Sequence, residues 1–387
     1  MADKIYSFIF EKGSKVHFND LSKPHTNNFS KNFKAMKQLK YAFLLPASFV
    51  LILLSCSQNN PNPLTSGNWV YLNNSILGDQ RNSAVSFVVG NNAYVGTGYN
   101  QGKNVRYSDL FSFNPTVGWL QLVSAPAGFT PRSNAVAFSI GTNGYIALGQ
   151  DNSNNYLADT WQYNTITNSW SQKDNFTVAG PNATARIDAM GFSINTLGYV
   201  MCGFDGGGNK KDAYSFDPTL AAGTQWKAVS PSFNGGKRQG GIVWVYKNKA
   251  YIVTGTDNGV LAFDFTVFDP TNTTTPWKSL RNINNYSSDS YDDDYTDIVR
   301  DHGVGFVLGD SAYITLGNNG GYSLKTWGYD FVHDTWFRKT NFEKSGRSNS
   351  IAFTLQGQSF VTTGKSNSQD FDDLNQWFPY QDYNAND

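Results

Sequence analysis

The stretch AVSFVVGNNAYVGTG at residues 84–98 decides the fold, because two runs of β-branched and aromatic residues flank the pair Gly90-Asn91. Gly-Asn between two such runs is typical of a tight β-hairpin, since both residues tolerate the backbone angles of a two-residue turn. The stretch GVGFVLGDSAYITLG at residues 303–317 has the same pattern around Gly309-Asp310. The chain therefore repeats one hairpin unit at distant places.

Comparison of the chain with itself finds six copies of this unit from residue 81 onward. Each copy has an arginine, an aromatic residue six positions later, a second aromatic residue at thirteen and a glycine at seventeen. The arginines are Arg81, Arg132, Arg186, Arg238, Arg300 and Arg347, and the first aromatic residues are Phe87, Phe138, Phe192, Trp244, Phe306 and Phe353. The second aromatic residues are Tyr94, Tyr145, Tyr199, Tyr251, Tyr313 and Phe360, and the glycines are Gly98, Gly149, Gly203, Gly255, Gly317 and Gly364.

Two further strands complete each copy. The third strands are predicted at 109–113, 159–163, 212–216, 264–268, 325–329 and 373–377, and fourth strands begin at Trp119, Trp170, Trp226, Trp277 and Trp336. A lone four-stranded sheet buries too little surface to be stable, so the six units must pack face to face around an axis. This arrangement is an all-β, six-bladed β-propeller.

The sixth copy ends without a tryptophan strand of its own. Upstream of the first copy, residues 67–72 read GNWVYL and supply the missing strand. We therefore expect the N-terminal strand to close the last blade and to leave no open sheet edge, within one propeller at residues 67–387. The repeated aromatic residues are interpreted as the core between blades, with ligand stacking as the alternative.

The order of arginine, aromatic, tyrosine, glycine, Asp-x-aromatic and tryptophan resembles the kelch repeat, as in the central domain of galactose oxidase. The resemblance covers residues 67–387 and implies the propeller fold but no single activity, because kelch-type propellers include actin and peptide binders, oxidases and sugar mutarotases. The sequence departs from the family where many repeats have a second glycine before the repeated one. Here that position is occupied by Thr97, Leu148, Cys202, Thr254, Leu316 and Thr363.

Residues 36–55 resemble the signal peptide of a bacterial lipoprotein. A basic stretch at 37–40 and an apolar stretch at 41–54 precede Cys56, and the run Leu-Leu-Ser-Cys resembles the lipobox whose cysteine is acylated. Fourteen helical residues span about 21 Å, which is shorter than the roughly 30 Å hydrocarbon core, so a membrane span is not expected. An ordinary cleavable signal or a buried helix is the alternative.

The N-terminal organisation follows from this interpretation. Residues 1–35 are read as a mis-annotated extension before a start at Met36, and residues 56–66 as a linker. Lipidation at Cys56 would place the protein in the cell envelope, at the outer membrane or in the periplasm of a host with two membranes, with the lipid as its membrane contact.

Composition excludes several classes of protein. After residue 55 the chain has a single Glu and abundant turn-forming residues, which excludes a helical bundle and a doubly wound α/β enzyme. The first 55 residues hold eight Lys and three acidic residues, so the remainder has a net charge of −5. This sign argues against nucleic acid as a partner.

Binding is expected on one face of the propeller. Hairpins between the first and second strands are minimal, whereas the loops between the second and third strands are longer and polar, at 99–108, 150–158, 204–211, 256–263 and 318–324. Because loops carry function more often than the strands that hold them, we assign binding to this long-loop face.

The six arginines begin the first strands on the long-loop face, and two interpretations of them stay open. In the first, each guanidinium donates to neighbouring carbonyl groups or to carboxylates such as Asp109, Asp159 and Asp212. In the second, some of the arginines bind carboxylates of a ligand. The candidate binding residues are then Arg81, Arg132, Arg186, Arg238, Arg300 and Arg347, with Asn134, Asp188, His302 and Asn349 two positions further on.

The fourth copy is the longest, with 62 residues from Arg238 to Arg300, and part of its excess is acidic. Carboxylates are ligands of Ca²⁺, so this segment is a weak Ca²⁺ candidate, although its spacing lacks the features of an EF-hand. A solvated acidic loop is the other interpretation. The carboxylates are those of Asp289, Asp292, Asp293, Asp294 and Asp297. No other metal and no cofactor is expected.

No catalytic residues are assigned. Galactose oxidase chemistry needs copper held by two His and two Tyr, with one Tyr cross-linked to Cys, and only His302, His333 and Cys202 remain here after the signal. A glycosidase needs two facing carboxyl groups, whereas the single Glu343 is expected at the surface. The sequence thus favours an envelope-anchored module that binds a glycan or a protein. The alternative is a cofactor-free sugar-modifying enzyme that resembles a sialic-acid mutarotase.

Overall fold

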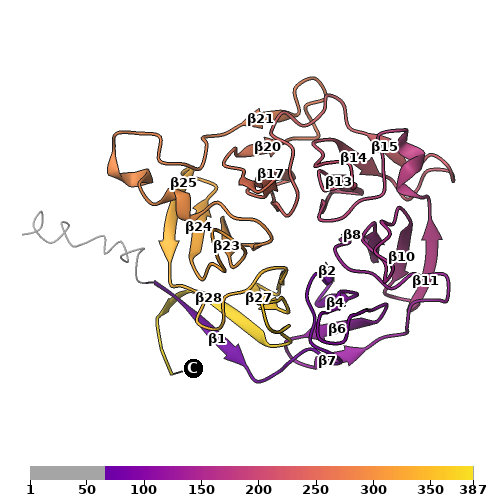
Figure 1. Ribbon diagram of the computed structural model, residues 1–387, viewed down its shortest axis with the longest axis horizontal. Helices are drawn as coiled ribbons and strands as arrows, with labels where there is room; N and C mark the ends of the chain where they lie inside the picture. Colours follow the sequence, from indigo (N-terminus) through magenta and orange to yellow (C-terminus); the bar gives the residue numbers. More distant parts are fainter. Residues whose placement is uncertain (1–65, 387) are drawn as a thin grey trace, which may run out of the picture. The chain divides into compact units, whose positions relative to one another are not determined.

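Residues 66–386 are described by the computed structural model, and they form six four-stranded antiparallel sheets around a common axis (Figure 1). The predicted extension, the signal peptide, Cys56 and the linker up to residue 65 lie outside the described residues. The predicted all-β, six-bladed propeller is confirmed. Within the described residues no helix is long and apolar enough to cross a membrane.

Each blade consists of consecutive strands that run from the axis outward. The first three blades are β2 (Val85–Val89), β3 (Asn92–Gly96), β6 (Leu110–Asn114) and β7 (Gly118–Gln121); β8 (Val136–Ile140), β9 (Asn143–Ala147), β10 (Thr160–Asn164) and β11 (Ser169–Lys173); and β12 (Met190–Ile194), β13 (Leu197–Met201), β14 (Ala213–Phe216) and β15 (Trp226–Ala228). The fourth and fifth are β16 (Ile242–Tyr246), β17 (Lys249–Val253), β20 (Thr266–Phe268) and β21 (Trp277–Ser279); and β22 (Val304–Leu308), β23 (Ser311–Thr315), β24 (Thr326–Asp330) and β25 (Thr335–Lys339).

The N-terminal strand closes the ring. The sixth blade consists of β26 (Ile351–Leu355), β27 (Gln358–Thr362), β28 (Leu374–Asp382) and β1 (Ser66–Leu72), and β1 lies along β28 in Figure 1. Trp69 pairs with Trp377 across the two strands, and their rings lie 4.8 Å apart. The predicted closure by residues 67–72 is confirmed, because β1 covers the strand edge that β28 would otherwise expose.

The repeated aromatic residues form the core between blades, as predicted. Phe138 pairs with Tyr145 across the hairpin of the second blade, and their rings stack at 5.5 Å. The ring of Phe138 also covers Gly198 of the third blade, where an added Cβ would lie 2.1 Å from it. Small residues at this position therefore let adjacent sheets pack closely. Trp244 departs from the pattern, because it stacks on Tyr329 of the next blade and not on its hairpin partner Tyr251.

Short elements decorate this framework. Two small hairpins, β4 (Tyr99–Asn100) with β5 (Val105–Arg106) and β18 (Thr256–Asp257) with β19 (Val260–Leu261), belong to the predicted long loops. Three 3₁₀ helices, η1 (Phe176–Ala179), η2 (Ser290–Asp292) and η3 (Tyr295–Asp297), lie in connections between blades. The predicted third strands begin within two residues of the observed ones, so the repeat pattern located the sheets closely.

Candidate functional site

The six repeated arginines are buried, and at most 1% of the surface of each residue is exposed. In the first blade, Nη1 of Arg81 donates to the Thr97 carbonyl at 3.0 Å, and both terminal nitrogens donate to the Asp109 carboxylate at 2.6 and 2.9 Å. Four other blades repeat the ion pair, with Arg132–Asp159, Arg186–Asp212, Arg238–Asp264 and Arg347–Asp373. This agrees with the first interpretation, in which each guanidinium donates to neighbouring carbonyl groups and carboxylates. The second, in which the arginines bind a ligand, does not fit guanidinium groups that are buried and already paired.

Arg300 is the exception among the arginines, because Lys325 occupies the position that holds aspartate in the other blades. Its guanidinium donates only to carbonyl oxygens, among them those of Leu316 at 3.0 Å and Lys325 at 2.9 Å. Burial without a facing carboxylate lowers the pKa of Arg300 below its usual range. Arg300 therefore also has a structural role, because its donors are used by backbone carbonyl groups of the protein.

The residues before the repeated glycines explain the departure from the Gly-Gly pattern. All six adopt left-handed backbone angles, with φ between 58° and 65°. This conformation turns their carbonyl oxygens toward Nη1 of the arginine in the same blade. It costs a non-glycine residue roughly 1–2 kcal/mol, which the buried hydrogen bond to the guanidinium helps to offset.

A second set of residues, two positions after each arginine, forms the mouth of the channel on the long-loop face. Their backbone amides and carbonyls are joined in a closed ring of six hydrogen bonds of 2.8–3.1 Å, each amide donating to the preceding blade. All six residues have left-handed backbone angles, with φ between 48° and 59°. The ring consists of Ser83, Asn134, Asp188, Gly240, His302 and Asn349.

The structure therefore brings together four of the ten candidate binding residues at one place. Asn134, Asp188, His302 and Asn349 line a cavity of about 130 Å³ at the channel mouth. Sequence reasoning missed the other two ring members, Ser83 and Gly240. Their shared position after the arginine was the available signal, together with the recurrence of residue types that accept left-handed angles.

His302 of the fifth blade reaches past the fourth blade to Asp188 of the third. Its Nε2 lies 3.4 Å from Asp188 Oδ2, and its Nδ1 lies 2.8 Å from Asp301 Oδ1. Asn134 donates to the other oxygen of Asp188 at 2.6 Å. The blade between them has Gly240 at this level, where an added Cβ would lie 2.7 Å from the imidazole. The missing side chain at residue 240 is what leaves room for the histidine.

The two carboxylates keep the imidazole charged. Burial by itself lowers the pKa of His302, but Asp188 and Asp301 outweigh it and raise the pKa to about 10. For Asp188 the effects have the opposite signs: burial by itself raises its pKa, but the facing imidazolium lowers it, and the resulting pKa lies below the usual range. At neutral pH the channel mouth therefore holds a protonated histidine between two ionised carboxylates.

The long loops form a collar around this mouth. In each blade the residue after the repeated glycine pairs in an isolated bridge or short strand with the loop's returning arm, as Tyr99 does with Arg106 and Gln150 with Tyr156. Arg106 links two blades, because its guanidinium donates to Ser133 Oγ and Gln150 Oε1, each at 2.9 Å. Hydrogen bonds between loops thus hold the collar in place.

The opposite end of the channel differs in chemistry. A cavity of about 340 Å³ there is lined by residues of the first strands, mainly apolar ones that include valines such as Val88, Val245 and Val307 and the first aromatic residue of every copy. His333 lies in the turn between β24 and β25 at this end, whereas His302 lies at the channel mouth. Within residues 66–386 the two histidines therefore do not form the copper site of a galactose oxidase.

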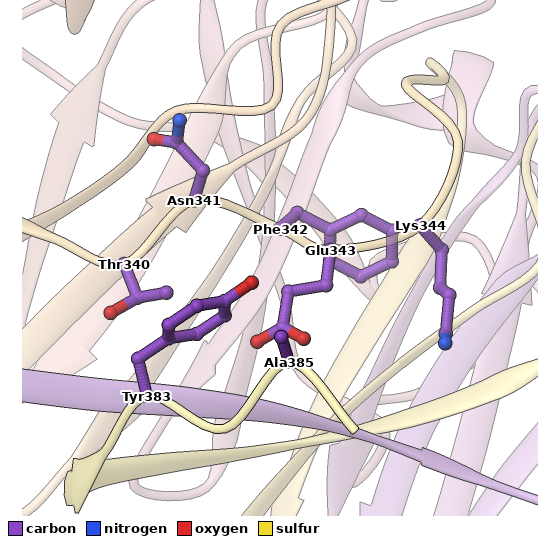
Figure 2. Close-up of a pocket in the computed structure, with 7 residues that line it drawn as sticks. All are labelled: Thr340, Asn341, Phe342, Glu343, Lys344, Tyr383 and Ala385. Carbon is purple, nitrogen blue, oxygen red and sulfur yellow. The ribbon is translucent and has the colours of Figure 1, made fainter. Parts of the chain in front are cut away.

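A cavity of about 590 Å³ lies where the two ends of the propeller meet. Figure 2 shows Tyr383 and Glu343 on facing sides of it. Oε1 of Glu343 accepts the backbone N–H of Trp69 at 3.2 Å, and the Lys344 ammonium lies over the Tyr71 ring. The sequence predicted Glu343 at the surface, and this prediction is wrong. Glu343 is half-buried, because it binds the strand that closes the ring.

The acidic segment of the fourth copy does not converge on one point. Asp292 is fully buried and accepts the backbone N–H groups of Tyr286 and Ser287 at 3.1 and 3.0 Å, with Nη2 of Arg281 at 2.5 Å. The remaining members of the set turn to other partners, with Asp293 on Asn285, Asp294 near Arg338 and Asp297 on Lys325. Asp289 is exposed. Within residues 66–386 no group of three or more His, Cys, Asp or Glu is arranged to hold a metal ion.

Comparison with known proteins agrees with the repeat pattern. A family model described as the KLHDC2/KLHL20/DRC7 Kelch-repeats domain matches residues 82–302, more than half of the chain. The chain belongs to the kelch-repeat family. Its kelch propeller is similar to the solved structure titled "Structure of YjhT", with a TM-score of 0.61 and 16% identity over 78% of this chain and 95% of that chain. At this identity the similarity shows the fold alone, and a search of curated proteins found no match.

The kelch arginines make a clear prediction for stability. Arg81→Met should lower the free energy of unfolding by about 3–5 kcal/mol, because it leaves Asp109 and the Thr97 carbonyl without their buried partner. In Arg81→Met/Asp109→Leu the loss should be smaller than the sum of the two single losses by about 1–3 kcal/mol. Urea denaturation followed by tryptophan fluorescence measures both quantities.

The matched control is Lys103→Met, which removes an exposed cation from an ion pair with Asp79 in the same blade. It should change the free energy of unfolding by less than about 1 kcal/mol. Stability of Arg81→Met equal to that of the wild type would contradict a structural role for the arginine.

The histidine at the channel mouth predicts a pH dependence. Because the pKa of His302 is raised to about 10, its stabilising effect is complete below its unfolded pKa of about 6.5 and is lost as the pH rises through 10. The difference in free energy of unfolding between wild type and His302→Gln should therefore be largest at pH 6 and decline steadily toward pH 10. The control His333→Gln, at an exposed histidine, should have little effect; a pH-independent difference for His302→Gln would rule out the ion pair.

Proposed function

We propose that the protein is a lipid-anchored module of the cell envelope that binds a glycan at the channel mouth on its long-loop face. The observation that carries the proposal is the polar cavity at that mouth, where Asp188, His302 and Asn349 converge from three blades. Ligand sites in proteins are concave and hold a few convergent polar groups, and this cavity meets both conditions. A kelch propeller is in general a scaffold for binding, and the surrounding loops enlarge the surface available to a ligand.

A glycan fits the mouth better than a protein does. The cavity volume of about 130 Å³ equals about four water molecules at liquid density, so it accepts a small polar portion of a ligand, such as the hydroxyl-bearing edge of one sugar ring, rather than a large side-chain surface. Protein interfaces depend on aromatic and arginine anchors, whereas the repeated arginines here are buried and paired. Binding of a protein through the outer loops is the other outcome of the tests.

A cofactor-free sugar-modifying enzyme, similar to a sialic-acid mutarotase, is the second candidate. The pair of His302 and Asp188 favours it, because opening and closing a sugar ring needs one group to donate a proton and one to accept it. Such an activity would appear in NMR as faster exchange between the anomers of a free sugar when the protein is added. Galactose oxidase activity is not proposed.

Binding at the mouth is tested by filling it. Ala135 lines the cavity, and Ala135→Gln places a longer side chain in it without changing the charge. On a glycan array, the detergent-solubilised full chain should bind at least one glycan, and Ala135→Gln should weaken that binding by about tenfold or more, the loss expected when a well-fitted contact is blocked.

The control for this prediction is Thr142→Gln, which introduces the same residue at the exposed hairpin tip of the same blade, on the opposite face. It should bind as the wild type does, and thermal unfolding should show that both variants are folded. Equal binding by Ala135→Gln and wild type would argue against the channel mouth as the site.

Anchoring is a separate part of the proposal and rests on the sequence around Cys56. Cys56→Ala should move most of the protein from the detergent phase to the aqueous phase in Triton X-114 partitioning, because acyl chains supply about 0.8 kcal/mol of membrane affinity per buried CH₂. Cys202→Ala is the matched control, since this thiol is buried in the propeller and its loss should leave partitioning unchanged. Detergent-phase partitioning of Cys56→Ala would contradict lipidation at that residue.

A further inference from the structure

The hydrogen-bonding groups at the channel mouth are only partly used within the protein. Asp188 lies in the third blade and Asn349 in the sixth, so they face each other across the axis of a six-membered ring. Each oxygen of Asp188 has one partner, Asn134 or His302, and keeps further acceptor capacity. Asn349 accepts from Ser348 through Oδ1, but within residues 66–386 its Nδ2 group has no hydrogen-bond partner.

The charges at the mouth decide which ligand suits these groups. Asp188, Asp301 and protonated His302 sum to one negative charge. The collar of the sixth blade adds one charge of each sign, from Lys365 and Asp370, which leaves the sum unchanged. The six arginines add no free cationic group, because their guanidinium groups are buried behind the ring.

A carboxylate on the ligand would therefore lie next to an ionised aspartate, while the six repeated arginines are buried and Arg106 of the collar already donates to Ser133 and Gln150. A hydroxyl group meets no such repulsion, because it donates to an aspartate oxygen and accepts from an amide nitrogen at the same time. Acceptors on one side of the mouth and a donor on the other match two hydroxyl groups of one sugar ring.

We propose that the channel mouth binds the uncharged, hydroxyl-rich terminal residue of a neutral glycan and discriminates against sugars that carry a carboxylate. One ligand hydroxyl donates to Asp188, and another accepts from Nδ2 of Asn349. This inference rests on the proposed function, because it names the class of glycan for the same site.

The test compares matched ligands on the full chain. Oligosaccharides ending in mannose, glucose or galactose are titrated by calorimetry beside the same oligosaccharides capped with sialic acid or glucuronic acid. The neutral set should bind at least about tenfold more tightly, the discrimination expected of a site built around specific polar partners.

Asp188→Asn keeps the shape of the side chain and removes its charge. It should weaken binding of the neutral set by about tenfold, as expected for loss of a charge-assisted acceptor, and should narrow the gap to the acidic set. Asp205→Asn is the control, because this carboxylate lies in the loop at 204–211 on the same face and is paired with Lys210. It should change neither affinity, and thermal unfolding should show that both variants are folded.

The outcomes separate this inference from the proposed function. Tighter binding of the acidic set would overturn the neutral class while the glycan-binding function stands. Unchanged binding of neutral sugars by folded Asp188→Asn would overturn the role of Asp188. Failure of the wild type to bind any glycan would contradict the proposed function and, with it, the inference.

Discussion

Two closed rings of backbone hydrogen bonds hold the blades together, and the rest of the structure depends on them. In one ring, each residue two positions after an arginine donates to its counterpart in the preceding blade; in the other, each repeated glycine donates to the carbonyl of the next blade's arginine. The second ring requires glycine, because a Cβ on Gly98 would lie 2.9 Å from the Asn82 carbonyl oxygen. A ring of bonds closes only if every blade presents the same backbone geometry, which explains why six divergent copies keep the same few residues at the same spacing.

The buried arginines maintain that geometry. Each one joins the start of its first strand to the end of the second through a carbonyl group, and in five blades also to the third strand through an aspartate. A guanidinium group suits this task because its planar array of donors satisfies several acceptors at once. Such a group cannot also serve a ligand, so the proposed function assigns recognition to the residues two positions further along the chain.

The channel mouth shows how the copies diverged where the scaffold permits it. The left-handed backbone at this level accepts Ser, Asn, Asp, Gly and His, and all five types occur in the ring. Because Gly240 of the fourth blade has no side chain, His302 of the fifth blade can reach Asp188 of the third. The ion pair at the channel mouth therefore depends on a glycine in the blade between its two partners. The opposite end of the channel is lined mainly by apolar residues, whereas the cavity at the seam is polar and its Glu343 binds the strand that closes the ring.

The sequence by itself determined the fold, the number of blades, the closing strand and the face of the long loops. These features depend on local pattern and on spacing, as with the Gly90-Asn91 turn or the tryptophan of residues 67–72, and each copy provides independent evidence. Only the tertiary structure decided between the two roles of the arginines, because burial and pairing with Asp109 or Asp159 depend on how distant strands meet. It alone also joined His302 to Asp188, residues 114 positions apart, since no spacing within one copy encodes a contact made past an intervening blade.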